Sequence, residues 1–139
     1  MVDQNCAYCM EGELVAKFGI KICELETSKV YLFKEQSHPG RCIVAHKKHV
    51  GDMNELTAEE RAAYFEDVAR VARAIMAAFH PDKVNYGAYG DTGHHLHFHL
   101  CPKYKDEFEW GGVFLMNPDK KYLSDEEYAD MIAKIKANL

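Results

Sequence analysis

The chain has 139 residues, of which 47% are hydrophobic and 12% aromatic, enough for one compact domain with an ordinary core. We therefore interpret residues 1–139 as a single domain. The formal net charge of −5 argues against a protein that grips duplex nucleic acid, because such proteins present a basic face. A small nucleotide in a locally positive pocket is still compatible with this charge.

The N-terminal segment and the cysteines indicate a cellular location. Met1–Asn5 lacks the charged-then-apolar pattern of a secretion signal, and no later stretch is apolar for long enough to span a bilayer. The five cysteines are an odd number, which in such a chain is typical of reduced thiols and not of a disulfide framework. The sequence therefore predicts a soluble, cytoplasmic protein without a membrane partner.

The first part of the chain predicts strands. Residues 20–34 alternate on both sides of Glu26–Lys29, which is typical of a β-hairpin. Turn-forming residues occupy positions 37–40, and residues 41–47 then predict a third strand.

A long helix follows. Thr57 and Glu60 form a capping box, and apolar residues recur at helical spacing from Tyr64 to Phe79. Pro81 cannot continue a helix, so we expect the helix to end just before it.

The second half predicts two more strands and a last helix. Residues 83–88 and 95–104 have the composition of strands, and the glycine-rich segment 87–93 joins them. A second capping box opens a helix over about residues 124–138. This order predicts an α+β fold: an antiparallel five-stranded sheet with one long helix and a C-terminal helix, both on one side.

Three histidines alternate with apolar residues in the last predicted strand. Side chains of a strand alternate between its faces, so His95, His97 and His99 share one side and the intervening residues share the other. The apolar side can be buried against a core. The other side then presents three imidazoles in a row, with neighbours about 7 Å apart along the strand.

This row of imidazoles has three interpretations. It could be the polar face of a half-buried strand, although histidine is not a favoured strand residue. All three side chains could bind one metal ion, as His-x-His pairs do in zinc enzymes. In the third interpretation, one imidazole attacks phosphorus while its neighbours orient it and stabilise the charged oxygens.

The segment before the histidines favours the third interpretation. Gly87, Gly90 and Gly93 allow backbone N–H groups to approach an anion closely. Thr92 lies between two of these glycines and adds a hydroxyl donor. Glycines alone would be weak evidence, because a turn between strands also needs them.

The motif His95-x-His97-x-His99, with apolar residues at x, resembles the signature of the histidine triad family. The resemblance covers most of the chain. Residues 39–44 and 47–50 are similar to the strand of that family that leads to a Lys-Lys-His sequence. The remaining matches precede the triad: Asn85, Gly90 and Thr92.

The resemblance implies roles for these residues and a homodimer with a continuous sheet. His97 would be the nucleophile that forms a covalent nucleotidyl-histidine, and its ring would donate to the backbone carbonyl of His95. His99 would contact the phosphate oxygens, while Asn85 and Thr92 would help to hold the phosphate and the leaving group. Water would then release a nucleoside monophosphate.

The chain also departs from the family pattern. Arg41 stands where many members have a histidine, and His94 precedes the triad. The position of a ribose-binding Asp or Asn is filled by Phe33, unless a gap moves Glu35 there. The loop before the triad is one residue shorter than usual. These differences bear on substrate preference and not on the nucleophile.

Cys6 and Cys9 suggest a second site, because cysteines at CxxC spacing are typical of half of the ligands of a zinc site. A buried or incidental cysteine pair is the alternative. The resemblance supplies the other ligands, because some histidine triad proteins bind structural zinc with a histidine at the place of His49 and with the first triad histidine, His95. His46 could replace His49. A structural zinc would hold the N-terminal segment against the catalytic strand.

The segment Trp110–Phe114, after the last predicted strand, has two interpretations. It closes over the active site, from the same or the partner subunit, or its tryptophan simply packs beside a turn.

We therefore expect a hydrolase that acts on a nucleoside phosphoramidate or a related nucleotide conjugate, with a purine base. Histidine at the third triad position fits the hydrolase branches of the family. A nucleotidyltransferase or phosphorylase could use the same intermediate. A regulatory module that binds zinc and nucleotide without chemistry is the other alternative, although such a module would not need His97, Thr92 and the glycines together.

Overall fold

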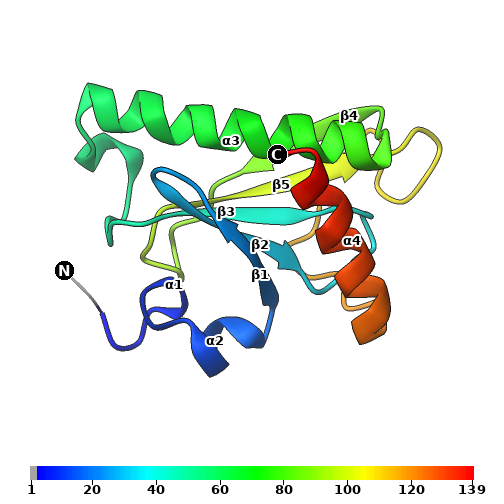
Figure 1. The fold of residues 1–139 in the computed structure, drawn as a ribbon, viewed down its shortest axis with the longest axis horizontal. Helices are drawn as coiled ribbons and strands as arrows, with labels where there is room; N and C mark the ends of the chain where they lie inside the picture. The colour runs from blue at the N-terminus through cyan, green and yellow to red at the C-terminus, as the bar shows by residue number, and fades with distance from the viewer. Residues whose placement is uncertain (1–2) are drawn as a thin grey trace.

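The computed structural model describes residues 3–139, so Met1 and Val2 of the N-terminal segment discussed above lie outside the described residues. Its centre is a five-stranded antiparallel sheet with the order β1-β2-β3-β5-β4, which confirms the predicted α+β fold (Figure 1). β1 and β4 form the two edges of the sheet. The strands are β1 (Gly19–Glu24), β2 (Ser28–Phe33), β3 (Cys42–His46), β4 (Lys83–Gly87) and β5 (His97–Lys103).

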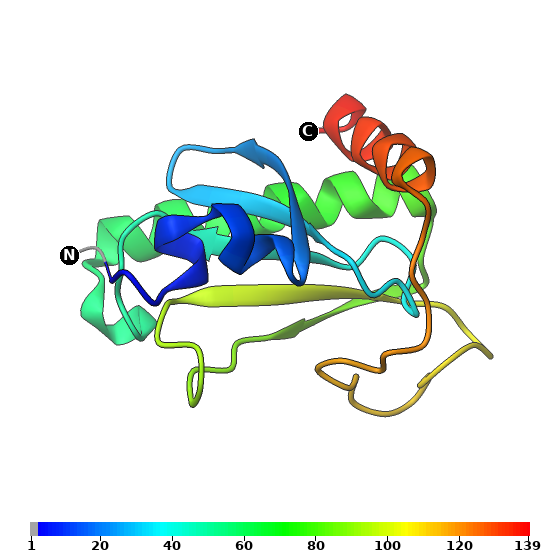
Figure 2. The ribbon, with the colours of Figure 1, turned by 90° about the horizontal axis from the view of Figure 1, so that it is seen from below.

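Helices cover both faces of the sheet. The two predicted helices, α3 (Ala58–Phe79) and α4 (Asp125–Ala137), lie on one face. Their common side is as expected, but two further short helices that we did not predict, α1 (Ala7–Met10) and α2 (Gly12–Ala16), pack on the opposite face (Figures 1 and 2). These helices have four and five residues, too few for a helical period to be visible in the sequence. A 3₁₀ turn, η1 (Met53–Glu55), precedes α3.

In the part of the chain that the structure describes, no helix combines the length and the apolar character that crossing a membrane requires.

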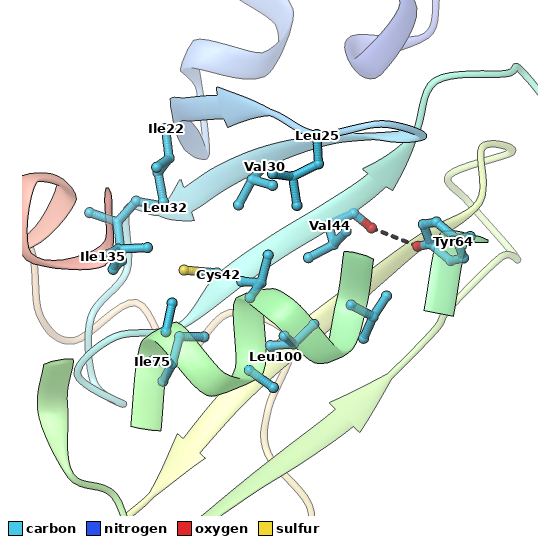
Figure 3. Close-up of a cluster of buried hydrophobic side chains, with 14 of the residues drawn as sticks. Ile22, Leu25, Val30, Leu32, Cys42, Val44, Tyr64, Ile75, Leu100 and Ile135 are labelled. Atoms are coloured by element: carbon cyan, nitrogen blue, oxygen red, sulfur yellow. Dashed lines mark hydrogen bonds between the residues drawn. The ribbon is translucent and has the colours of Figure 1, made fainter. Parts of the chain in front are cut away.

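The larger core lies between the sheet and the two long helices. Val30, Val44 and Leu100 project from three adjacent strands towards Ile75 of α3 and Ile135 of α4 (Figure 3). All five side chains are fully buried. The core therefore occupies this face of the sheet. The opposite face is the one that can hold a functional site.

A smaller core lies on the opposite face. Tyr31, Ile43 and Ala45 pack there against Tyr8 of α1 and Val15 of α2. Because residues of β2 and β3 alternate between the two cores, both strands are buried on both faces.

The last predicted strand begins later than expected. We predicted residues 95–104, whereas β5 starts at His97. The N–H of His95 donates to the carbonyl of Gly93, and that of Leu96 donates to Val50, so both backbone groups are used outside the ladder of β5. The predicted apolar side is confirmed, since the residues that alternate with the histidines pack in the larger core: Leu96, Phe98 and Leu100.

Helix α3 is fixed at its start and along its length. The capping box of Thr57 and Glu60 is present as predicted. The hydroxyl of Tyr64 donates to the carbonyl of Val44 at 2.7 Å (Figure 3). One turn further on, the buried carboxylate of Asp67 accepts from the N–H and hydroxyl of Thr27 and from the hydroxyl of Ser28, at 2.7 to 2.9 Å. These bonds tie the helix to the β1–β2 turn.

We expect Asp67→Ala to lower the free energy of unfolding by about 2 kcal/mol, because it leaves the buried donors of the turn without an acceptor. Urea unfolding followed by circular dichroism measures this loss. Glu66→Ala is the matched control on the same helix, since the Glu66 carboxylate is exposed and its pair with Arg73 lies at the surface. Equal effects of the two substitutions would contradict the role assigned to Asp67.

Candidate active site

The sheet register places two of the triad histidines on the face of the smaller core. His97 pairs with Ala45 and His99 pairs with Ile43, and all four side chains share that face. Nδ1 of His97 lies 2.7 Å from the carbonyl oxygen of His95. A carbonyl only accepts, so Nδ1 carries the proton and the lone pair is on Nε2. This is the orientation that the family resemblance implied.

His99 has the opposite arrangement. A guanidinium nitrogen of Arg41 lies 3.1 Å from its Nδ1. Arginine only donates, so Nδ1 of His99 accepts and the neutral ring carries its proton on Nε2. The ring centres of His97 and His99 are 5.4 Å apart. Nε2 of His97 therefore carries a lone pair, whereas Nε2 of His99 carries a proton.

Burial keeps all three triad rings uncharged at neutral pH. It lowers the pKa of His97, and it lowers the pKa of His95 to about 4. Burial, together with the charge of Arg41, lowers the pKa of His99 to about 3. A neutral imidazole is the form that attacks phosphorus.

These rings open onto a pocket of about 990 Å³. Its size is suited to a small organic ligand. Thr92, which is exposed, lines the pocket, whereas Asn85 and Gly90 are not among its lining residues. Asn85 lies on β4, opposite Cys101 of β5. The apolar wall is formed by Tyr8, Phe18, Phe33, Ile43 and Phe114.

Tyr8 is a pocket residue that the sequence analysis did not identify. It lies between the two cysteines of the CxxC motif, and its ring stands 5.0 Å from that of His97 and 5.4 Å from that of His95. An aromatic residue inside this motif was the available signal. Its importance becomes visible only in the structure, where α1 places the Tyr8 ring beside both histidines.

The loop between β5 and α4 is held by buried polar side chains. Lys103 donates to the carbonyls of Glu109 and Gly112, and Arg41 donates to those of Leu115 and Met116. The same loop brings Phe114 of the same chain to 6.3 Å from the ring of His99. The end of the segment Trp110–Phe114, Val113 and Phe114, therefore lines the pocket, whereas Trp110 is not among its lining residues.

Glu35 does not replace Phe33 in the pocket. Its buried carboxylate accepts from Ser37 and from the backbone N–H groups of Lys120 and Lys121. Phe33, in contrast, lines the pocket. The shift of Glu35 considered in the sequence analysis is therefore not seen.

A metal-ligand cluster lies next to the triad. It consists of Cys6, Cys9, His49 and His95, whose ligand atoms all lie within 4.8 Å of one another. Nε2 of His95 lies 2.6 Å from the carbonyl oxygen of His46 and donates to it, so Nδ1 is free to face the thiols. This cluster could hold a metal ion.

Three spacings within the cluster are close to those of tetrahedral zinc, although the widest spacing reaches 4.8 Å. Sγ of Cys6 lies 3.3 Å from Nδ1 of His95, Sγ of Cys9 lies 3.3 Å from Nδ1 of His49, and the two Nδ1 atoms are 3.1 Å apart. A tetrahedron around zinc with ordinary bonds to nitrogen and sulfur has edges of about 3.3–3.8 Å. The hydrogen bond from His95 to the carbonyl of His46 is the kind that orients a ligand histidine.

The cluster also bears on the alternatives left open by the sequence. His46 is outside it, and its Nδ1 accepts from the N–H of Lys48. Only His95 of the triad belongs to it, so a single ion bound by all three triad histidines does not match the arrangement of residues 3–139.

The family model of the HIT domain matches residues 19–106 of this chain. The chain belongs to the histidine triad (HIT) family. This HIT protein is 28% identical over 123 residues to the protein named hit of Bacillus subtilis, an alignment covering 84% of this chain and 83% of the relative. It is 26% identical over 116 residues to adenosine 5′-monophosphoramidase hnt1 of Schizosaccharomyces pombe, covering 77% and 80%.

Solved structures of HIT proteins share the fold. A histidine triad protein of Sinorhizobium meliloti superposes with a TM-score of 0.84 at 24% identity, covering 92% of this chain and 95% of that one. A zinc-bound histidine triad family protein of Mycobacterium smegmatis superposes with a TM-score of 0.68 at 23% identity, covering 95% and 94%.

We expect Zn²⁺ to protect two of the five cysteines of this HIT protein from alkylation. In chelator-treated protein, the half-buried Cys6, Cys9 and Cys23 are accessible to iodoacetamide, while Cys42 and Cys101 are buried and stay unreactive. Zn²⁺ slows alkylation of Cys6 and Cys9 on the order of tenfold or more, because coordinated thiolates are shielded.

Peptide mass spectrometry measures the rate at each cysteine. Cys23 is the internal control, since it lies on β1 and not in the cluster, and Mg²⁺ is the control ion. Unchanged rates at Cys6 and Cys9, or equal slowing at Cys23, would contradict a specific metal site.

Proposed function

We propose that this protein is a nucleotide hydrolase that acts through a covalent nucleotidyl-histidine on His97. The observation that carries the proposal is the 2.7 Å contact between Nδ1 of His97 and the carbonyl oxygen of His95. The Nδ1–H of His97 is held by this carbonyl, so the nitrogen left for a ligand in the pocket is the unprotonated Nε2. A neutral imidazole with one nitrogen fixed in this way is prepared for nucleophilic attack.

In the proposed first step, the Nε2 lone pair of His97 forms a bond to the α-phosphorus while the bond to the leaving group breaks. The leaving group departs with that electron pair and takes up a proton from solvent. In the second step, water attacks the same phosphorus and gives up a proton to solvent, the N–P bond breaks with its electron pair returning to Nε2, and a nucleoside monophosphate leaves. His99 and Thr92 line the pocket beside His97 and would donate to the phosphoryl oxygens in both steps.

For the substrate we propose a nucleoside phosphoramidate or a related conjugate with a purine base. The relationship to the fission yeast adenosine 5′-monophosphoramidase supports this class. The pocket supports it as well, because its aromatic wall offers Tyr8, Phe18 and Phe33 for stacking a flat base. Asn85 and Gly90 stay predictions as phosphate contacts.

His97→Ala should reduce kcat/KM for a fluorogenic adenosine phosphoramidate by at least about 10⁴-fold, because no other nucleophile takes over the first step. The fold and nucleotide binding should persist. Mass spectrometry after a rapid quench should detect a nucleotidylated wild-type protein and no such adduct in the variant.

His80→Asn is the control, since His80 ends α3 at an exposed position with a left-handed backbone that asparagine tolerates. Full activity of His97→Ala would refute the nucleophile. Faster release of the adduct with added phosphate or sugar phosphate, giving the transferred nucleotide as product, would favour the transferase. Tight nucleotide binding without any turnover would favour the regulatory module.

We also propose that zinc occupies the cluster of Cys6, Cys9, His49 and His95 as a structural ion. The zinc-bound relative from Mycobacterium smegmatis and the mixed thiolate and imidazole donors support zinc over harder ions. Bound there, zinc would supply a rigid link between α1 and the strand of the triad. Ligation through two thiols requires both cysteines to be reduced, which fits the cytoplasmic location that we propose.

A homodimer through the β4 edge is our proposal for the assembly. β4 ends the sheet, so its outer backbone groups are available to a second strand. Tyr86 on β4 and Met76 on the adjacent α3 are exposed apolar side chains that line one shallow groove. A second copy would cover this groove and continue the sheet.

The double substitution Met76→Lys and Tyr86→Lys should convert the dimer to a monomer, because two charges would be buried in the interface. Size-exclusion chromatography with light scattering measures the mass in solution. Tyr122→Lys is the control, since Tyr122 is equally exposed but lies in the segment before α4. A wild-type monomer, or a double variant that stays dimeric, would contradict this interface.

A further inference from the structure

Arg41 is a buried cation without an anionic partner. Its side chain is completely buried, and its donors reach the carbonyls of Leu115 and Met116 and Nδ1 of His99, at 2.9 to 3.1 Å. Among residues 3–139 it forms no direct ion pair, since Glu35 and Glu109 act on its charge only from beyond ion-pair distance, and its Nε has no hydrogen-bond partner. Buried charges are normally paired, so this arrangement calls for an explanation.

The guanidinium is held in place by two aromatic rings. Its central carbon lies 4.2 Å from the ring centre of Phe33 and 4.8 Å from that of Phe114. Such contacts stabilise a cation without neutralising it. The positive charge therefore stays next to Nδ1 of His99. It belongs to a residue that does not itself line the pocket.

The contact with His99 has a chemical consequence. Because the guanidinium cannot accept a hydrogen bond, Nδ1 of His99 must supply the lone pair. The proton of the neutral ring is then on Nε2, opposite to the tautomer of His97. Without Arg41, nothing in the described contacts of His99 would select between the two tautomers.

We propose that Arg41 is a positioning residue that fixes His99 as an Nε2–H donor to the phosphoryl oxygens and places a permanent positive charge behind that donor. The phosphoryl group of the substrate would then supply the negative charge that Arg41 has no direct partner for in the free protein. This inference rests on the proposed function for its effect on catalysis, but the tautomer of His99 is a property of the free protein.

The test uses three variants of the full chain. Arg41→Met removes the donor and the charge at similar volume, whereas Arg41→Lys keeps a cationic donor. Lys103→Met is the matched control, because Lys103 is also a buried cation that anchors the 104–124 loop but contacts no triad histidine. It separates loosening of the loop from an effect on His99.

Nitrogen-15 NMR of the imidazoles reads the tautomer, and His99→Gln assigns the signals. We expect wild-type His99 to show a protonated Nε2 and an unprotonated Nδ1. The same pattern should persist in Arg41→Lys and Lys103→Met and be lost in Arg41→Met. For a nucleoside phosphoramidate, kcat of Arg41→Met should fall about 10²-fold with little change in KM, as for a donor that acts mainly in the transition state.

A protonated Nδ1 on wild-type His99 overturns the proposal, and this result is available even if Arg41→Met does not fold. An unchanged tautomer or unchanged kcat in folded Arg41→Met overturns it too, as does a Lys103→Met variant that reproduces both losses. If the wild-type protein turns over no nucleotide conjugate, the proposed function fails, while the NMR measurement still decides whether Arg41 sets the tautomer of His99.

Discussion

The hydrogen bond from Nδ1 of His97 to the carbonyl oxygen of His95, 2.7 Å long, is the contact on which the proposed chemistry depends. It fixes the ring and leaves one nitrogen unprotonated. The carbonyl belongs to the segment just before β5, where the N–H of Leu96 donates to the carbonyl of Val50. The residues that precede the regular strand therefore contribute to the orientation of the His97 ring.

His95 links this contact to the metal-ligand cluster. Its carbonyl holds His97, its Nε2 donates to the carbonyl of His46, and its Nδ1 faces the thiols of Cys6 and Cys9. Any shift of α1 would act on the same residue that orients His97. The cysteine motif also carries Tyr8, whose ring covers both histidines, so the cluster and the pocket wall are one structural unit.

The other side of the pocket depends on buried charges instead of apolar packing. Glu35, Arg41 and Lys103 are almost fully buried, and each binds backbone groups of the long loop before α4. A loop with little regular structure has many free carbonyl and N–H groups, and charged side chains satisfy them more strongly than neutral ones. This is how Phe114 is kept near His99 without a helix or strand to carry it.

The sequence by itself determined the local elements and the chemistry-bearing residues. Alternation marked the triad and the apolar side of its strand, capping boxes marked α3 and α4, and the triad pattern with its flanking motifs indicated the family, because these signals lie between residues close in the chain. Only the tertiary structure decided that α1 covers the second face, that Glu35 faces the loop, and that Arg41 reaches His99. These depend on contacts between residues far apart in the sequence, such as the 58 positions between Arg41 and His99, which no local period encodes.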